Sequence, residues 1–96
     1  MRLWIDDERK PPKGYVWIKT VNDAIAFIEQ NYNVIELIDI DHDAGIYACE
    51  GGDYIRILDW LEFMGLAYPI RIHSMNSVGR QNMRLIIEKN GWREIR

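Results

Sequence analysis

Five short segments of the chain are either apolar runs or alternate between hydrophobic and polar residues, and this pattern predicts five β-strands. The first segment, residues 3–5, stops at a pair of aspartates, and the third segment, residues 34–40, stops at Asp41. The second segment follows the stretch "KPPKG", which cannot form a helix because proline lacks the donor N–H. We place the five strands at residues 3–5, 15–20, 34–40, 69–72 and 92–95.

Three other segments carry apolar residues at the spacing of an amphipathic helix. Thr20 or Asn22 is a candidate N-cap for the first helix, and Gly65 is a candidate C-cap for the second. The order of elements is β-β-α-β-α-β-α-β, which predicts a parallel sheet built by right-handed crossovers. The predicted helices span residues 23–30, 54–64 and 76–90.

The connection between the first two strands is too short for this alternation. About ten residues join them, which is too few for a crossover helix of normal length. We therefore expect three helices on one face of the sheet, and a second face that is partly exposed or is covered by aromatic residues or a second copy of the chain. The predicted apolar face holds Leu3, Ile5, Val16, Ile18, Ile35, Leu37, Ile70 and Ile72. The second face holds Arg2, Trp4, Tyr15, Trp17, Lys19, Glu36 and Arg71.

Trp4, Tyr15 and Trp17 predict an aromatic patch on the second face of the sheet. An exposed patch of this kind is typical of a protein interface, so a homodimer through this face is one prediction. The alternative is that the three rings shield the sheet and bind no partner. The sequence leaves both alternatives open.

Composition and charge narrow the class of protein. The 96 residues suit one domain, residues 1–96, with a single modest core. The net charge of -3 argues against binding of extended nucleic acid through phosphate contacts, although a local basic patch would escape this argument. No apolar run approaches the roughly 20 residues that span a bilayer, and the charged N-terminus does not resemble a signal peptide. The one cysteine, Cys49, cannot form an internal disulfide, so we expect a cytoplasmic protein.

Acids and histidines follow three predicted strands directly, at the ends where ligands bind in open parallel sheets. Clustered carboxylates suit a hard cation such as Mg²⁺ or Mn²⁺, and histidines can transfer protons near neutral pH. Any one of these residues alone would be an ordinary loop or capping residue, so the prediction of a functional site depends on their combination. The group contains Asp6, Asp7, Asp41, His42, Asp43, His73 and Ser74.

The start of the third predicted helix has the features of an anion site. A helix N-terminus offers unpaired N–H groups to a phosphate, Gly79 lets a ligand come close, and Arg80 can bind a phosphate with two hydrogen bonds. Capping by Asn76 or Ser77 explains the polar residues at this position almost as well. Cation-binding acids that face an anion-binding helix start favour a site for a metal-bound phosphate, and hence phosphate-ester chemistry.

Three stretches, "WIDDERKPP", "IDIDHDAG" and "IHSMNSVGRQNM", resemble the motifs of the cyclic-phosphate-processing receiver-like family, a divergent relative of the response-regulator receiver fold. The resemblance runs from Leu3 to Met83, which is most of the chain. It implies an α/β fold of the receiver-like (flavodoxin-like) type, with a five-stranded parallel sheet in the order 2-1-3-4-5. It also implies that the first and last helices of the receiver fold are missing, in agreement with a half-covered sheet.

The resemblance also implies roles for individual residues. Receivers hold Mg²⁺ with the acids after the first and third strands, which here are Asp6, Asp7 and Asp41. The implied phosphate-binding residues are Arg9, Ser74, Asn76, Gly79 and Arg80. The implied catalytic residues are His42, His73 and Asp43, with the histidines as acid and base in an order that the sequence leaves open and Asp43 orienting one of them.

Three functions are compatible with these residues. The first is a small metal-dependent phosphoesterase, a hydrolase that processes cyclic phosphates of nucleotides or RNA ends with Mg²⁺ or Mn²⁺ as cofactor. The second is a non-catalytic module that binds a phosphorylated nucleotide or a protein partner. The third is a phospho-accepting receiver, and the lack of a lysine at the end of the fifth strand argues against it. Whether the chain is an enzyme stays open at this point.

Overall fold

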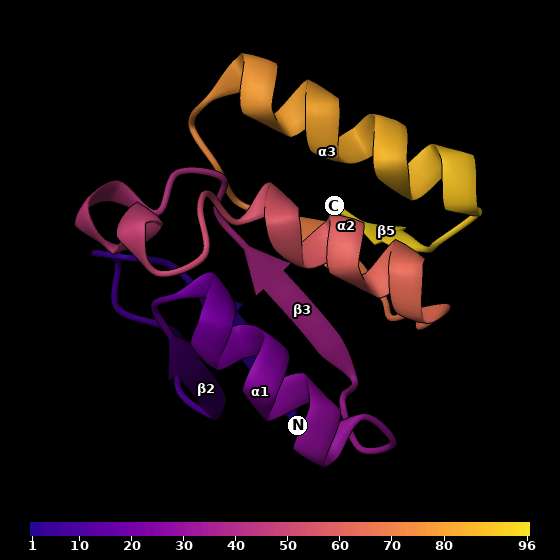
Figure 1. The fold of residues 1–96 in the computed structure, drawn as a ribbon, viewed down its shortest axis with the longest axis horizontal. Coiled ribbons are helices and arrows are strands. Elements are labelled where there is room, and N and C mark those ends of the chain that lie inside the picture. The colour runs from indigo at the N-terminus through magenta and orange to yellow at the C-terminus, as the bar shows by residue number, and fades with distance from the viewer.

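The chain forms five β-strands, three α-helices and one 3₁₀-helix, and the computed structural model describes all residues, 1–96. The strands are β1 (Arg2–Ile5), β2 (Tyr15–Ile18), β3 (Leu37–Ile40), β4 (Ile70–Ile72) and β5 (Glu94–Ile95). The helices are α1 (Val21–Asn31), η1 (Gly45–Cys49, the 3₁₀-helix), α2 (Ile55–Met64) and α3 (Ser77–Asn90). All strands are parallel and lie in the order β2-β1-β3-β4-β5, which confirms the predicted receiver-like topology. In Figure 1, β3 lies between β2 and β5.

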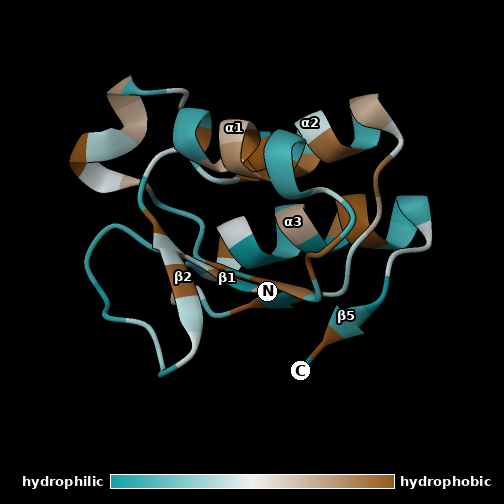
Figure 2. Ribbon diagram, turned by 90° about the horizontal axis from the view of Figure 1, so that it is seen from below, coloured by the Kyte–Doolittle hydropathy of each residue, from teal (hydrophilic) through white to brown (hydrophobic).

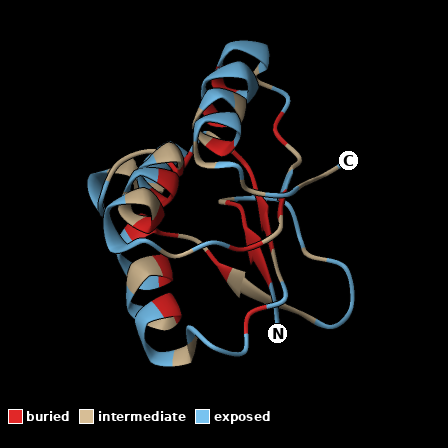
Figure 3. Ribbon diagram, turned by 90° about the vertical axis from the view of Figure 1, so that its right-hand side faces the viewer, coloured by how far each residue is buried: buried red, intermediate tan, exposed pale blue.

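The three α-helices pack on one face of the sheet, and no helix covers the other face (Figure 2). The buried positions of the helices lie on the sides of the helices that face the strands (Figure 3). Leu3 and Ile38 from the sheet and Ile28, Leu58 and Met83 from the helices are fully buried in one hydrophobic core. This arrangement confirms the prediction that the helices cover mainly one face. None of the helices combines the length and the apolar character that a membrane crossing requires.

The helix ends are fixed by capping residues, most of them as predicted. The Thr20 hydroxyl accepts a hydrogen bond from the Asp23 N–H at 2.9 Å, so Thr20 and not Asn22 is the N-cap of α1. The Asn76 side chain accepts from the Gly79 N–H at 2.9 Å and caps α3. Gly65 ends α2 in the left-handed region, with φ of 69°, where glycine carries no steric penalty.

The third strand starts later than predicted, and its side chains alternate in the opposite phase. Ile38 pairs with Leu3 on one side and with Ile70 on the other, so Ile38 lies on the core face and Leu37 on the helix-free face. The placement of Leu37 on the core face was therefore wrong. Ile35 is buried in the core, but it precedes the strand, so the alternation shifts by one residue between Ile35 and Ile38. The shift places Asp39 on the helix-free face, beside Trp4 and Arg71.

The aromatic residues on the helix-free face are less exposed than predicted. Trp4 is only 8% exposed, because its indole stacks on His73, packs edge-on against Tyr15 and donates from Nε1 to the Arg9 carbonyl at 2.7 Å. Tyr15 and Trp17 are half-buried, and Trp17 Nε1 donates to the backbone carbonyl of Asp6 at 2.8 Å. Of the two alternatives, the exposed patch is wrong for Trp4, whose burial fits a ring that shields the sheet, and the indoles of Trp4 and Trp17 hold the loop after β1 in place. The homodimer stays a prediction.

Candidate functional site

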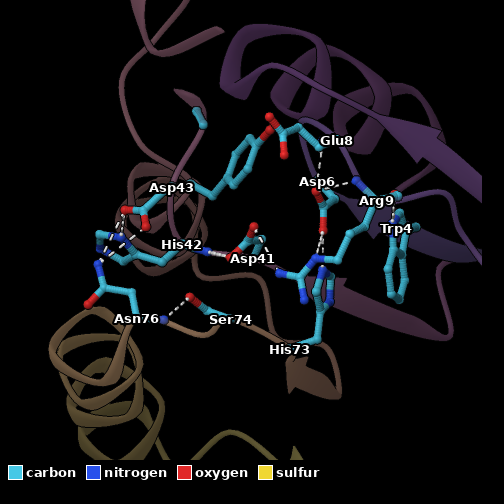
Figure 4. A network of polar contacts seen from close by, with 12 residues as sticks. Trp4, Asp6, Glu8, Arg9, Asp41, His42, Asp43, His73, Ser74 and Asn76 are labelled. Atoms are coloured by element: carbon cyan, nitrogen blue, oxygen red, sulfur yellow. Dashed lines mark hydrogen bonds and ion pairs between the residues drawn. The ribbon is translucent and has the colours of Figure 1, made fainter. Parts of the chain in front are cut away.

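Three strand ends bring two aspartates and a histidine together. The backbone pairing of the sheet continues past the strands: the Asp41 N–H donates to the Ile5 carbonyl at 2.9 Å, and the His73 N–H donates to the Ile40 carbonyl at 3.0 Å. Asp6 follows β1 in the same way. One ligand atom each from Asp6, Asp41 and His73 lies within 4.8 Å of the others. We call these three residues the acid cluster (Figure 4).

Asp6 is the most buried member of the acid cluster and accepts hydrogen bonds on both carboxylate oxygens. Its Oδ1 accepts from the backbone N–H groups of Glu8 and Arg9, both at 2.9 Å. Its Oδ2 lies 3.1 Å from Arg9 Nε and 2.9 Å from His73 Nε2. Burial alone would raise the pKa of Asp6, but the hydrogen bonds outweigh burial and lower the pKa below its ordinary value. Asp6 is therefore an anion at neutral pH although it is buried.

Arg9 lies against the carboxylates of the acid cluster, where the sequence had predicted a phosphate-binding residue. Arg9 Nε contacts Asp6 Oδ2, and Arg9 Nη2 lies 3.3 Å from Asp41 Oδ2. Burial lowers the pKa of Arg9, but the hydrogen bond to Asp41 and the two negative charges outweigh it and raise the pKa. The guanidinium is thus a permanent positive charge that partly neutralises the two acids.

His73 is held on three sides. Its Nε2 faces Asp6, its Nδ1 lies 2.6 Å from Asp39 Oδ1, and its ring stacks on Trp4 with centroids 3.9 Å apart and planes at 6°. Its side chain is only 7% exposed. Both ring nitrogens are therefore occupied by carboxylates, and neither is free to meet a ligand without displacing one of them.

Asp39 is the site residue that the sequence analysis missed. It is buried on the helix-free face, and its Oδ2 accepts from Arg71 Nη1 at 3.2 Å while its Oδ1 faces His73. A signal was present in the stretch "IDID", where Ile38 and Ile40 alternate with Asp39 and Asp41. With both isoleucines in the core, strand alternation places both aspartates on the opposite face.

Asp7 lies outside the acid cluster, although the sequence predicted it as a metal ligand. Its carboxylate lies so close to Gly45 that a Cβ at residue 45 would collide with it. Burial raises the pKa of Asp7 above its ordinary value, and repulsion from Asp6, Glu8 and Asp41 adds to this effect. Asp7 therefore interacts with the acid cluster through its charge, but its carboxylate is not among the ligand atoms that lie within 4.8 Å of one another.

His42 and Asp43 form a second polar group on the other side of Asp41 (Figure 4). His42 Nδ1 lies 2.8 Å from Asp43 Oδ1, and Asn76 Nδ2 donates to both Asp43 oxygens at 3.3 and 3.4 Å. The hydrogen bond from His42 is the main reason why the pKa of Asp43 is lowered. His42 Nε2 has no partner within the chain, and no buried side-chain nitrogen or oxygen lacks one, so Nε2 reaches the surface although the His42 side chain is only 14% exposed.

The start of α3 packs directly against His42. A Cβ at Gly79 would collide with the imidazole ring, so a glycine is required where the helix meets the histidine. The buried Ser74 hydroxyl accepts from the Asn76 N–H at 3.0 Å and thereby shapes the turn into the helix. Arg80 is exposed and makes no ion pair. Of the predicted phosphate-binding residues, Arg80 therefore has its charge free, whereas Ser74 and Asn76 already serve the turn and the cap.

A comparison with protein-family models relates this geometry to known proteins. The model of the cyclic-phosphate processing receiver domain matches residues 1–89. The chain belongs to that family. Comparisons with curated proteins and with solved structures found no match. The matched residues include the whole acid cluster and the His42 group, so the resemblance predicted from the three motifs is confirmed.

In this cyclic-phosphate processing receiver domain, the donor atoms of the acid cluster fit a divalent cation. Two carboxylates and one imidazole are compatible with Mg²⁺ and more so with Mn²⁺, which accepts nitrogen ligands readily. A second set of donor atoms, from His42, Asp43 and Asp53, also lies within 4.8 Å of one another. The carboxylates of both sets already have partners within the chain, but those of the second set are more exposed, whereas Asp6 and Asp41 are buried, so the acid cluster is the stronger candidate.

The end of β5 differs from that of a phospho-accepting receiver domain. The strand consists of Glu94 and Ile95, and no lysine follows it. The nearest lysine in the sequence, Lys89, pairs with Glu62 at 3.4 Å near the C-terminal ends of α2 and α3. The residue that follows β5 is Arg96, and its guanidinium Nε lies 3.6 Å from Glu94 Oε2.

Proposed function

We propose that this cyclic-phosphate processing receiver domain is a small metal-dependent phosphoesterase that opens cyclic phosphodiesters of nucleotides or RNA ends. The observation that carries the proposal is the position of His42. Its Nε2 has no partner within the chain, its Nδ1 is held by Asp43, and it directly follows Asp41 of the acid cluster. A proton-transfer group and a cation site thus lie side by side.

The acid cluster supplies the cation site in this proposal. Asp6 and Asp41 would hold Mg²⁺ or Mn²⁺, and His73 would add a third donor, Nε2, by giving up its contact with Asp6 Oδ2. A bound divalent cation neutralises charge on the non-bridging oxygens of a phosphodiester. The stack on Trp4 and the contact with Asp39 fix the His73 ring, which suits a residue that positions a ligand.

His42 performs the proton transfers in this proposal. The Asp43 carboxylate accepts a hydrogen bond from Nδ1–H and so leaves a lone pair on Nε2, as a general base requires. Nε2 takes a proton from the attacking water as the new P–O bond forms. The same proton then passes to the leaving oxygen as the ring P–O bond breaks. His73 is a weaker candidate for this role, because both its nitrogens already face carboxylates.

In this proposal, the first turn of α3 supplies the residue that binds the phosphate of the substrate. Arg80 is exposed and free of ion pairs, and it lies one residue after Gly79, which packs on His42. An arginine at this position can bind a phosphate oxygen that approaches Nε2 of His42. The same features support a nucleotide or an RNA end equally, so the substrate class is left to experiment.

The test is turnover by the purified protein. We would offer 2′,3′-cyclic nucleotides, 3′,5′-cyclic nucleotides and cyclic dinucleotides with Mg²⁺ or Mn²⁺, and use EDTA as a control. We expect metal-dependent opening of one ring class that is lost in Asp41→Asn. The matched control is Asp59→Asn, which removes the same charge from an exposed position on α2. Failure to open any ring class in the presence of bound metal would contradict the phosphoesterase.

A second candidate function is supported by one observation. The carboxylates of the acid cluster are already paired with Arg9 and His73, so the cluster is electrostatically satisfied without a cation. This favours a non-catalytic module that binds a phosphorylated ligand through Arg80 and the start of α3. Ligand binding without turnover, undisturbed by His42→Gln, would identify such a module.

A further inference from the structure

Arg9 occupies the two carboxylate oxygens that a cation would need. Asp6 uses Oδ1 for two backbone N–H groups, and Asp41 uses Oδ1 for the His42 N–H at 2.7 Å. Each acid therefore presents only Oδ2 to the acid cluster. Arg9 contacts both of these oxygens, with Nε 3.1 Å from Asp6 Oδ2 and Nη2 3.3 Å from Asp41 Oδ2, while His73 Nε2 contacts only that of Asp6, at 2.9 Å. Figure 4 shows its side chain lying between the two acids.

The Arg9 guanidinium is not needed to hold the loop after β1. The backbone of this loop is fixed separately, by the hydrogen bonds from the Glu8 and Arg9 N–H groups to Asp6 and by the bond from Trp4 Nε1 to the Arg9 carbonyl. The Arg9 side chain is 46% exposed, whereas those of Asp6 and Asp41 are 1% and 11% exposed. The guanidinium can therefore turn toward solvent while the backbone and both acids stay in place.

We propose that Arg9 is a tethered counter-ion that a divalent cation displaces. Without metal, its guanidinium neutralises Asp6 and Asp41. A cation held by Asp6 and Asp41 would release the guanidinium, which would then be free to bind a phosphoryl group at the same edge of the sheet. This last step rests on the proposed function. The exchange reconciles the predicted phosphate-binding role of Arg9 with its observed contacts to the acids.

The exchange makes metal binding and phosphate binding dependent on each other. A phosphate that holds Arg9 away from the acids removes the competitor of the cation, so it tightens metal binding. By thermodynamic linkage, the cation must tighten phosphate binding by the same factor. Removal of the guanidinium should therefore have two opposite effects: tighter metal binding alone, and a weaker dependence of metal binding on phosphate.

The first experiment measures Mn²⁺ affinity by electron paramagnetic resonance in the absence of phosphate. Arg9→Gln removes a competing charge that is close but partly exposed, so we expect Mn²⁺ to bind roughly tenfold more tightly than to wild type. Arg9→Lys keeps the charge but cannot bridge both acids, so its affinity should lie between the two. The control is Arg56→Gln, which removes the same charge from an exposed residue of α2 that makes no ion pair, and it should bind like wild type.

The outcomes separate this proposal from the proposed function. Unchanged or weaker Mn²⁺ binding by Arg9→Gln would overturn the counter-ion even if wild type turns over cyclic phosphates. Tighter binding by Arg9→Gln would support the counter-ion even if no substrate is turned over. Thermal unfolding in EDTA will show whether Arg9→Gln folds. If it does not fold, Arg9→Lys decides the question: a Mn²⁺ affinity equal to or below that of wild type would overturn the proposal.

The second experiment repeats the Mn²⁺ titrations with inorganic phosphate present. In wild type, phosphate should tighten Mn²⁺ binding severalfold, and in Arg9→Gln this factor should fall toward one. Arg56→Gln should retain the wild-type factor. An undiminished factor in Arg9→Gln would show that the displaced guanidinium does not hold the phosphate, and would overturn that half of the proposal.

Discussion

The two histidines of this domain lie at the same edge of the sheet in opposite settings. His73 is on the helix-free face, 7% exposed, with both ring nitrogens on carboxylates and its ring on Trp4. His42 is on the helix side, against Gly79, and is 14% exposed, with one nitrogen on Asp43 and the other without a partner in the chain. A ring whose contacts are all made within the protein can position other groups, whereas a ring with one open nitrogen can exchange a proton with a ligand.

The carboxylates beside the two histidines differ in the same way. Asp39 is buried and shared between His73 and Arg71, so its charge cannot be solvated if a partner is lost. The Asp43 side chain is 59% exposed, and water can replace either of its partners. The comparison therefore predicts that changes near His42 affect chemistry and changes near His73 affect metal binding and stability.

The largest expected effect is on turnover. His42→Gln keeps a polar side chain but cannot act as a general base, so kcat should fall by roughly 10²–10⁴-fold. Mn²⁺ affinity should stay near wild type, because His42 is not part of the acid cluster. Steady-state kinetics with the ring class that wild type opens, together with Mn²⁺ titration, would measure both quantities.

His73→Gln is the matched variant for this comparison. It should weaken Mn²⁺ binding and lower turnover at limiting metal, and excess metal should restore part of the lost rate. The assignment of roles would have to be reversed if His73→Gln abolished turnover with unchanged metal affinity while His42→Gln remained active.

The next effect is on stability, and it contrasts the two carboxylates. Asp39→Ala leaves Arg71 and the buried His73 without their shared partner, so the free energy of unfolding should fall by about 3 kcal/mol. Asp43→Ala removes an exposed partner of His42 and should cost less than about 1 kcal/mol. Urea unfolding in EDTA measures both values at one pH. If the two variants lost the same free energy of unfolding, the carboxylates beside His73 and His42 would contribute equally to stability, and the comparison would be wrong.

Much of the fold and the site followed from the sequence, for a topological reason. In a parallel sheet, the residues that directly follow each strand must meet at one edge, so the motifs at Asp6, Asp41 and His73 could be placed together without knowledge of side-chain contacts. The order of the strands followed from the family resemblance. The helix ends followed from capping residues such as Thr20 and Gly65.

The remaining features depend on contacts that spacing does not encode. The run "VIELIDI" is apolar enough to fit the core in either phase of strand alternation, so the position of Asp39 was missed. The burial of Trp4 depends on a loop that folds back to accept its indole N–H at Arg9. The direction of the Arg9 side chain, toward the acids and not toward solvent, depends on which carboxylate oxygens the backbone leaves unpaired.

The smallest expected effect concerns Asp7, which hydrogen-bonds to neither histidine but interacts with the acid cluster through its charge. Because its pKa is raised in the folded protein, ionised Asp7 opposes folding at neutral pH. Asp7→Asn should therefore raise the free energy of unfolding in EDTA at neutral pH, by less than about 1 kcal/mol. The gain should be present above the folded pKa and disappear as the pH falls below the ordinary value of 3.8, where wild-type Asp7 is protonated in both states.

Urea unfolding of Asp7→Asn at neutral and at acidic pH checks this sign, with Asp59→Asn as the control for an exposed aspartate. Added Mn²⁺ sharpens the result, because a cation in the acid cluster cancels the repulsion that Asp7 experiences. Wild type should gain more stability from Mn²⁺ than Asp7→Asn does, whether or not Asp7 touches the metal. If Asp7→Asn is less stable than wild type at neutral pH, the Asp7 carboxylate must have a stabilising partner. In that case repulsion among the carboxylates at this edge of the sheet does not destabilise the fold, and cation binding cannot stabilise the protein by removing it.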